Sequence, residues 1–97
     1  MTSTRRDAAH EATKQLSVLA ENLRARGFSA DLTQAGRYWC LHVANLAVPK
    51  LAETVYAAPV DGQWWFWWSW ADRITPLAEV DTAAFKIAYV LTPQGDV

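Results

Sequence analysis

The chain contains the stretch Trp64-Trp65-Phe66-Trp67-Trp68-Ser69-Trp70, which holds five of its six tryptophans. Side chains this bulky suit a pleated strand and crowd a helix, so the stretch predicts a β-strand over residues 64–70. Successive side chains of a strand point to opposite faces of the sheet. The rings therefore cannot all enter one core, and the sequence predicts aromatic side chains on both faces.

A second strand, at about residues 52–58, precedes this stretch, and Pro59-Val60-Asp61-Gly62-Gln63 between the two is a hairpin signal. Glycine supplies the positive φ that a tight turn needs. A loop of two or four residues gives one face Trp64, Phe66, Trp68 and Trp70 with Val55 and Ala57, and the other face Trp65 and Trp67 with Tyr56. A loop of three residues shifts the register and exchanges these partners. Either register leaves both faces aromatic.

The hydrophobic period predicts the remaining elements. Residues 4–26 repeat apolar side chains at spacings of three and four, which is typical of an amphipathic helix that Gly27 closes. Its apolar stripe is Ala9, Ala12, Leu16, Leu19 and Leu23. The period then changes to two, which predicts strands over about residues 28–33 and 38–45. Residues 72–76 break the pattern, and a final helix is expected over about residues 81–91, with Asp81 as its N-cap.

These elements predict one α+β domain over residues 1–97, in which a helix, a four-stranded antiparallel meander and a second helix follow one another. Short connections favour the meander, and both helices most simply cover one face of the sheet. The opposite face then has no element left to cover it. We expect Tyr56, Trp65 and Trp67 on that open surface, beside His42 and Cys40. Exposed apolar surface of this kind usually marks a binding site, and Trp and Tyr are enriched at interface hot spots.

Composition excludes several classes of protein. The chain is 52% hydrophobic, which excludes disorder, and its single Cys excludes a disulfide scaffold. A formal net charge of −1 argues against a general binder of duplex nucleic acid. The N-terminus lacks the apolar core of a signal peptide, and the apolar stretch 64–71 is far shorter than the roughly 20 residues of a membrane span. We therefore expect a cytoplasmic protein that does not enter a membrane.

The residues that carry chemistry give weak signals. Cys40 and His42 point to the same face of one strand, and a thiolate beside a His is one way to activate a nucleophile. No acidic residue is placed to orient the pair, so we assign no catalytic residue. One Cys and two His are too few for a structural zinc site, and we expect no metal or cofactor. Asp72 and Arg73 mark the rim of the aromatic face, where an ion pair or a turn contact is the expected role.

Several functions are compatible with an aromatic sheet face. Aromatic rings can stack unpaired bases, but Arg37, Lys50 and Arg73 are balanced by Glu53, Asp61 and Asp72, so nucleic acid is not favoured. An unusually large core, with the outer rings half-covered by loops and the tail, is the structural alternative. Our hypothesis is a non-enzymatic interaction module that forms a homodimer or binds a protein partner through this face. The alternative is a small-molecule binding protein, or a minimal enzyme, with a pocket between the helices and the sheet.

The stretch 64–70, with Asp61-Gly62 before it and Arg73-Ile74-x-Pro76 after it, resembles a group of short actinobacterial proteins of uncharacterised function. In that group a similar helix precedes a tryptophan-rich hairpin and a final alanine-rich helix. The resemblance covers most of the chain and implies a bacterial cytoplasmic setting. The group has no established activity, so the resemblance implies no catalytic residue.

Overall fold

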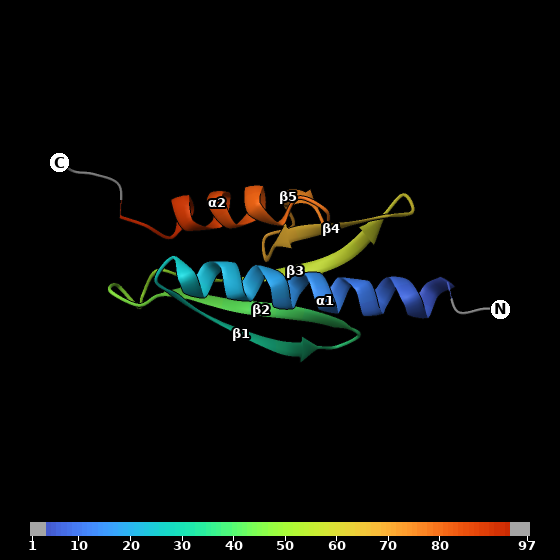
Figure 1. Cartoon of the computed structure of the whole chain (residues 1–97), viewed down its shortest axis with the longest axis horizontal. Helices are drawn as coiled ribbons and strands as arrows, with labels where there is room; N and C mark the ends of the chain where they lie inside the picture. The colour runs from blue at the N-terminus through green and yellow to red at the C-terminus, as the bar shows by residue number, and fades with distance from the viewer. Residues whose placement is uncertain (1–3, 94–97) are drawn as a thin grey trace.

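In the computed structural model, which describes residues 4–93 and the side chains of residues 10–34 and 36–93, two helices and five antiparallel strands form an α+β fold. The elements are α1 (Thr4–Ala25), β1 (Phe28–Ala35), β2 (Tyr38–Asn45), β3 (Ala52–Val60), β4 (Gln63–Trp68), β5 (Arg73–Pro76) and α2 (Val80–Val90) (Figure 1). The sheet has the order β1-β2-β3-β4-β5, so each described strand pairs with its neighbours in sequence.

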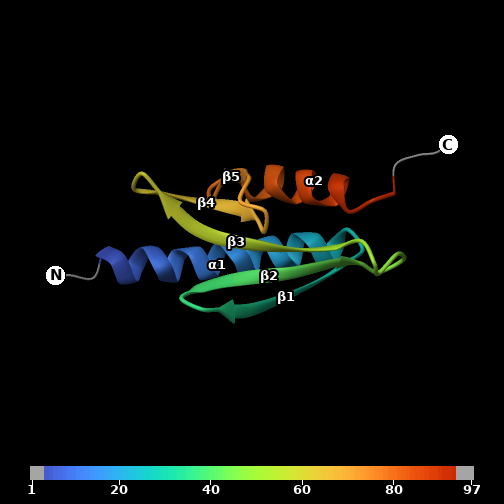
Figure 2. The same cartoon turned by 180° about the vertical axis from the view of Figure 1, so that it is seen from behind.

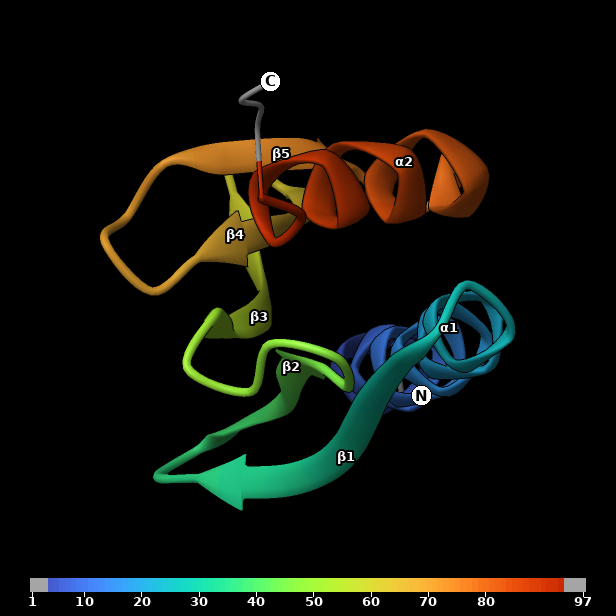
Figure 3. The same cartoon turned by 90° about the vertical axis from the view of Figure 1, so that its left-hand side faces the viewer.

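Both helices lie on one face of the twisted sheet. Seen end-on, the strands rise from β1 to β5, and α1 and α2 lie on the same side of them (Figure 3). Helix α1 packs against β1, β2 and β3, whereas α2 packs against β5 and against α1. The view from behind has the strands in front of α1, so this second face of the sheet is turned away from the helices (Figure 2).

The core lies between the helices and the sheet. Its fully buried side chains include Leu16, Leu19 and Leu23 of α1, Ile87 of α2, and Leu41, Val43, Val55 and Phe66 of the sheet. The predicted stripe of α1 is confirmed from Ala12 onward, and the side chain of Ala9 lies outside the described residues. Burial of this stripe is the main source of helix stability, because helices gain little from propensity alone.

The turn between β3 and β4 fixes the register of the aromatic strand. Val60 pairs with Gln63, so the loop has two residues, Asp61 and Gly62, with φ of 51° and 78°. Positive φ at both central positions is the pattern of a type I′ turn, whose twist matches that of the strands. Val55 therefore lies opposite Trp68, and the register predicted for a two-residue loop is confirmed.

The prediction of four strands is wrong, because a tight turn begins within the segment assigned to the fourth strand, and residues 73–76, expected to break the pattern, form a fifth strand. Strand β4 ends at Trp68 instead of residue 70, and β5 begins at Arg73. The amide of Ala71 donates to the carbonyl of Trp68 at 3.0 Å, and the amide of Trp68 donates to the carbonyl of Asp72 at 2.8 Å. Ala71 has a φ of 72°, in a position where such turns normally place glycine. The sequence therefore carries no turn signal here.

The start of α2 also differs from the prediction. The helix begins at Val80, and Glu79 occupies the N-cap position without a side-chain capping hydrogen bond. Asp81, the predicted cap, lies in the first turn and accepts a hydrogen bond of 2.9 Å from the amide of Asn22 on α1. An acidic side chain in the first turn still stabilises the helix dipole, so Asp81 joins the two helices instead of capping one.

The strained turn gives the first prediction. Replacing Ala71 by Gly relieves a left-handed alanine, which costs about 1–2 kcal/mol, against a smaller loss from the greater freedom of the unfolded chain. We expect the free energy of unfolding to rise by about 0.5–1 kcal/mol, measured by urea denaturation.

Gly62→Ala is the matched control. A Cβ at Gly62 meets nothing within 4 Å, so only its φ of 78° penalises the alanine, and stability should fall by about 1 kcal/mol. A loss of stability in Ala71→Gly would contradict the assignment of strain to Ala71.

Candidate functional site

The face of the sheet turned away from the helices carries three aromatic side chains. Tyr56 lies opposite Trp67 and Ala58 lies opposite Trp65, so Tyr56, Trp65 and Trp67 share this face. None of the three belongs to the core packed under the helices, and all three are half-buried. No helix of the described residues covers this surface, which we call the open face (Figure 2).

The two indoles of the open face are held in place by their neighbours. The Nε1 of Trp67 donates to the carbonyl of Ala58 at 3.0 Å, so its ring lies toward the adjacent strand. The guanidinium of Arg73 lies 4.6 Å from the centroid of the Trp65 ring, which is cation–π geometry. The rings are thus covered in part by groups of their own surface, and the open face is preformed.

Cys40 and His42 belong to the same face but do not form a nucleophile. Cys40 lies opposite Tyr56 and is 2% exposed, and this burial raises the pKa of its thiol. A raised pKa keeps the thiol protonated and unreactive. His42 is exposed, and its Nδ1 lies 3.4 Å from the hydroxyl oxygen of Thr54 instead of contacting Cys40. His42 therefore contributes a polar border to the face.

The predicted rim residues Asp72 and Arg73 do different things. Arg73 covers Trp65, as described above, whereas Asp72 accepts a hydrogen bond of 3.0 Å from the Nε1 of Trp70. The sequence predicts Trp70 on the same strand as Trp68. It lies in the turn, stacked on Trp68 with ring centroids 4.8 Å apart and planes 8° from parallel. Its side chain stays 48% exposed, so the turn adds an aromatic surface that strand alternation did not predict.

At each edge of the sheet, a cationic side chain from a helix donates a hydrogen bond to a backbone carbonyl. In the two-residue hairpin closed by Ala35 and Tyr38, the backbone groups of Ala30 point away from β2. Arg24 of α1 donates to that carbonyl. At the other edge, Lys86 of α2 donates to the carbonyl of Ile74 at 3.2 Å. Free edge groups are templates for pairing with another chain, so these contacts disfavour association through the edges.

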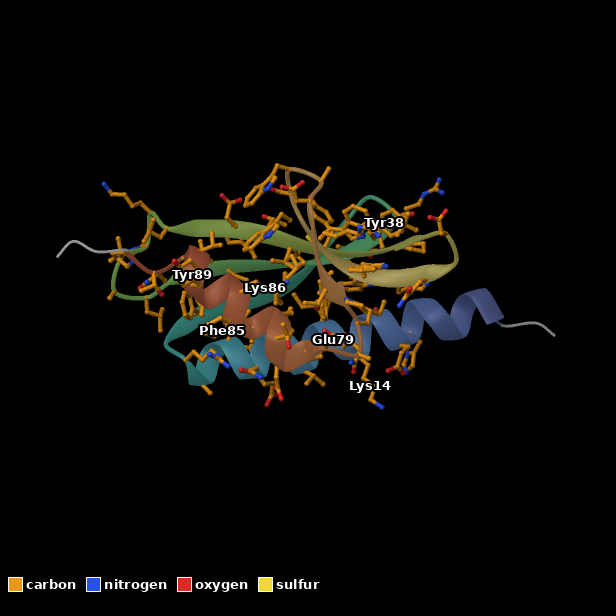
Figure 4. All side chains as sticks on the ribbon, turned by 90° about the horizontal axis from the view of Figure 1, so that it is seen from above. Lys14, Tyr38, Glu79, Phe85, Lys86 and Tyr89 are labelled. Carbon is orange, nitrogen blue, oxygen red and sulfur yellow. The ribbon has the colours of Figure 1, made fainter. Side chains whose placement is uncertain are left out.

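A second apolar surface lies on the outer side of the helices. Phe85 and Tyr89 of α2 are 61% and 62% exposed, and Figure 4 shows both along α2, on the opposite side of the view from Tyr38. They line a shallow groove of about 230 Å³ with Arg26, Ala88 and Thr92. The hydrophobic pattern of the sequence does not separate Phe85 and Tyr89 from the core.

The cavity between α1 and the sheet is small. It measures about 30 Å³ and is lined by Ala12, Thr13, Leu16, Arg37, Tyr38, Trp39, Ala57 and Trp64. Small-molecule sites usually measure about 300–1,000 Å³, so this cavity is too small for a metabolite. In the described residues, no three side chains of His, Cys, Asp or Glu form a group that could hold a metal ion.

Comparisons with known protein families, with curated proteins and with solved structures find no match to this chain. Neither described helix is sufficiently long and apolar to span a membrane. We therefore infer the function from the open face and the turn beside it.

The burial of Cys40 gives the second prediction. In the folded protein it should react with an aromatic disulfide reagent much more slowly at about pH 8 than it does in urea. The thiol of the unfolded chain ionises near its ordinary pKa of 9.0, whereas the folded thiol stays protonated to higher pH. The stability that depends on the neutral thiol is therefore present below about pH 9 and is lost above it.

Cys40→Ala is the control for this pH dependence. Between about pH 8 and pH 10, the free energy of unfolding should fall further in the wild type than in the variant. Equal reaction rates for the folded and unfolded chains would instead identify an accessible thiol and restore the nucleophile hypothesis.

Proposed function

We propose that the protein is a non-enzymatic interaction module, in which two copies pack their open faces together. The observation that supports this is the pair of half-exposed indoles, Trp65 and Trp67, on a sheet face that no described helix covers. Small domains bury a limited fraction of their surface, and two sheets pack face to face at about 10 Å. A homodimer would bury this aromatic surface and enlarge the core at once.

The composition of the open face favours a second copy as the partner. Its β4 side carries the large rings, whereas Ala44 and Ala52, which lie opposite each other on β2 and β3, have small side chains. A two-fold axis brings the same patch of both subunits together. With the strands antiparallel across that axis, the rings of one copy would fit over the alanines of the other.

Charge and edge geometry agree with this arrangement. Asp31 and His42 lie opposite each other, and Arg73 lies near the rings, so the face bears both acidic and basic side chains. Such a surface does not repel its own copy. Because Arg24 and Lys86 occupy carbonyls of the edge strands, face packing is favoured over strand addition.

A different protein on the same face is the second candidate, and the aromatic rings support it equally. The small-molecule alternative has less support, because the cavity between α1 and the sheet, of about 30 Å³, is too small for a ligand. A cytoplasmic, actinobacterial setting is part of the proposal, and its actinobacterial part rests on the resemblance alone.

The solution mass tests the homodimer and is the third prediction. Light scattering over a hundredfold range of concentration should give about twice the chain mass of 10.9 kDa. Trp65→Ser combined with Trp67→Ser removes the two rings that would be shared, and should give a cooperatively folded monomer. Ala44→Arg, which removes no ring but places a long charged side chain where the rings of the second copy would pack, should have the same effect.

Phe85→Ser is the matched control, because it replaces an exposed aromatic side chain on the helix side, away from the open face. It should remain a dimer. A wild type that is monomeric at every concentration would overturn the homodimer. Monomers in Phe85→Ser alone would move the interface to the helices, and loss of cooperative unfolding in the double variant would place Trp65 and Trp67 in the core.

A further inference from the structure

The turn between β4 and β5 presents a rigid indole to solvent. One face of the Trp70 ring lies on Trp68, and its Nε1 is bound to Asp72, so the ring is fixed from two directions. Because the inner face is covered, the 48% of the side chain that stays exposed is mainly the outer face and rim. The turn projects from the sheet on the side away from the helices, where another molecule has access (Figure 3).

Two carboxylates lie at this turn. Asp72 accepts from Trp70, and Glu53 of β3 accepts a hydrogen bond of 3.3 Å from the hydroxyl of Ser69 in the same turn. Both interactions are with neutral donors, and within residues 10–93 neither carboxylate pairs with a Lys, Arg or His. An ionised carboxylate has about four acceptor positions, so each retains capacity for a cationic donor.

Another indole of the same hairpin already contacts a cation. Trp65, on β4, is covered by the guanidinium of Arg73 at 4.6 Å. Trp70 has an exposed ring face and lacks such a guanidinium among the described residues, yet Asp72 binds its Nε1 and Glu53 binds the adjacent Ser69. A cation is attracted to the face of an indole, and more so where negative charge is near. The turn thus has the surroundings of a cation–π pair without its cation.

We propose that the turn binds an arginine side chain of a partner protein, with the guanidinium stacked on the outer face of Trp70 and donating to Asp72 and Glu53. Arginine fits better than lysine because its guanidinium is planar, weakly hydrated and able to stack and donate at the same time. The fixed ring loses little freedom on binding, which favours affinity. This site is separate from the open face and does not depend on the homodimer.

The test uses the full chain and peptides of defined charge. The indole Nε1–H signal of Trp70 is followed by NMR during titration with the peptide acetyl-Gly-Arg-Gly-Arg-Gly-amide. Saturable shifts of this signal are expected, and the same peptide with citrulline for arginine should bind at least about tenfold more weakly, because citrulline keeps the shape but loses the charge. Added salt should weaken binding of the arginine peptide.

Variants assign the contacts. Asp72→Asn and Glu53→Gln should each weaken binding about threefold, and both keep an oxygen that accepts the present hydrogen bond. Glu21→Gln, an exposed acid on α1, is the matched control and should bind like the wild type. Absence of saturable shifts, equal binding of the citrulline peptide, or unchanged binding in both Asp72→Asn and Glu53→Gln would each overturn the site.

Two further arms separate this proposal from its neighbours. Acetyl-arginine-amide that binds as tightly as the peptide would indicate a small-molecule site and overturn the protein partner. Light scattering on the same samples distinguishes the two proposals. A dimer that does not bind the peptide overturns only the arginine site, and a monomer that binds it overturns only the homodimer.

Discussion

The pleat of strand β4 is the constraint on which the rest of the structure depends. Phe66 and Trp68 enter the core under the helices, so Trp65 and Trp67 must point the other way. A slip of one residue would exchange these pairs and place Phe66 on the open face. The type I′ turn at Asp61-Gly62 prevents that slip, because both residues are already in the left-handed region that the two-residue loop requires. The core and the open face are thus set by the same turn.

The strength of the local signal explains which features the sequence could predict. Asp61-Gly62 and the stripe of Leu16, Leu19 and Leu23 follow patterns with direct physical causes, and both are found in the structure. The sequence does not predict the fifth strand, because Ala71 occupies a left-handed position where a turn normally has glycine. The place of Trp70 on Trp68 depends on that turn, and the exposure of Phe85 and Tyr89 depends on how α2 packs against α1. Such features depend on tertiary packing, which the hydrophobic periodicity of the sequence does not predict.

The two faces of the sheet differ in how their polar groups are satisfied, and this bears on function. On the helix side, the side-chain Nδ2 of Asn45 donates to the carbonyl of Leu91 at 2.8 Å, while its Oδ1 accepts from the backbone amides of Ala47 and Val48. These contacts close the end of the core. On the open face, by contrast, the Nε1 of Trp67 is satisfied within its own surface. Its ring therefore presents mainly apolar surface, and a partner there would gain from burial more than from hydrogen bonds.

Trp65 and Trp70 show how one residue type serves two ends in the same hairpin. Arg73 can cover Trp65 because β5 runs antiparallel to β4 and brings the guanidinium back over the ring. That arrangement requires the chain to reverse within a few residues, and the reversal itself places Trp70 outside the sheet with Asp72 at its edge. The same hairpin therefore places Arg73 over one indole and directs a carboxylate to the other. Because the guanidinium of Arg73 lies on Trp65, the cation of the site proposed at Trp70 is one that a partner supplies.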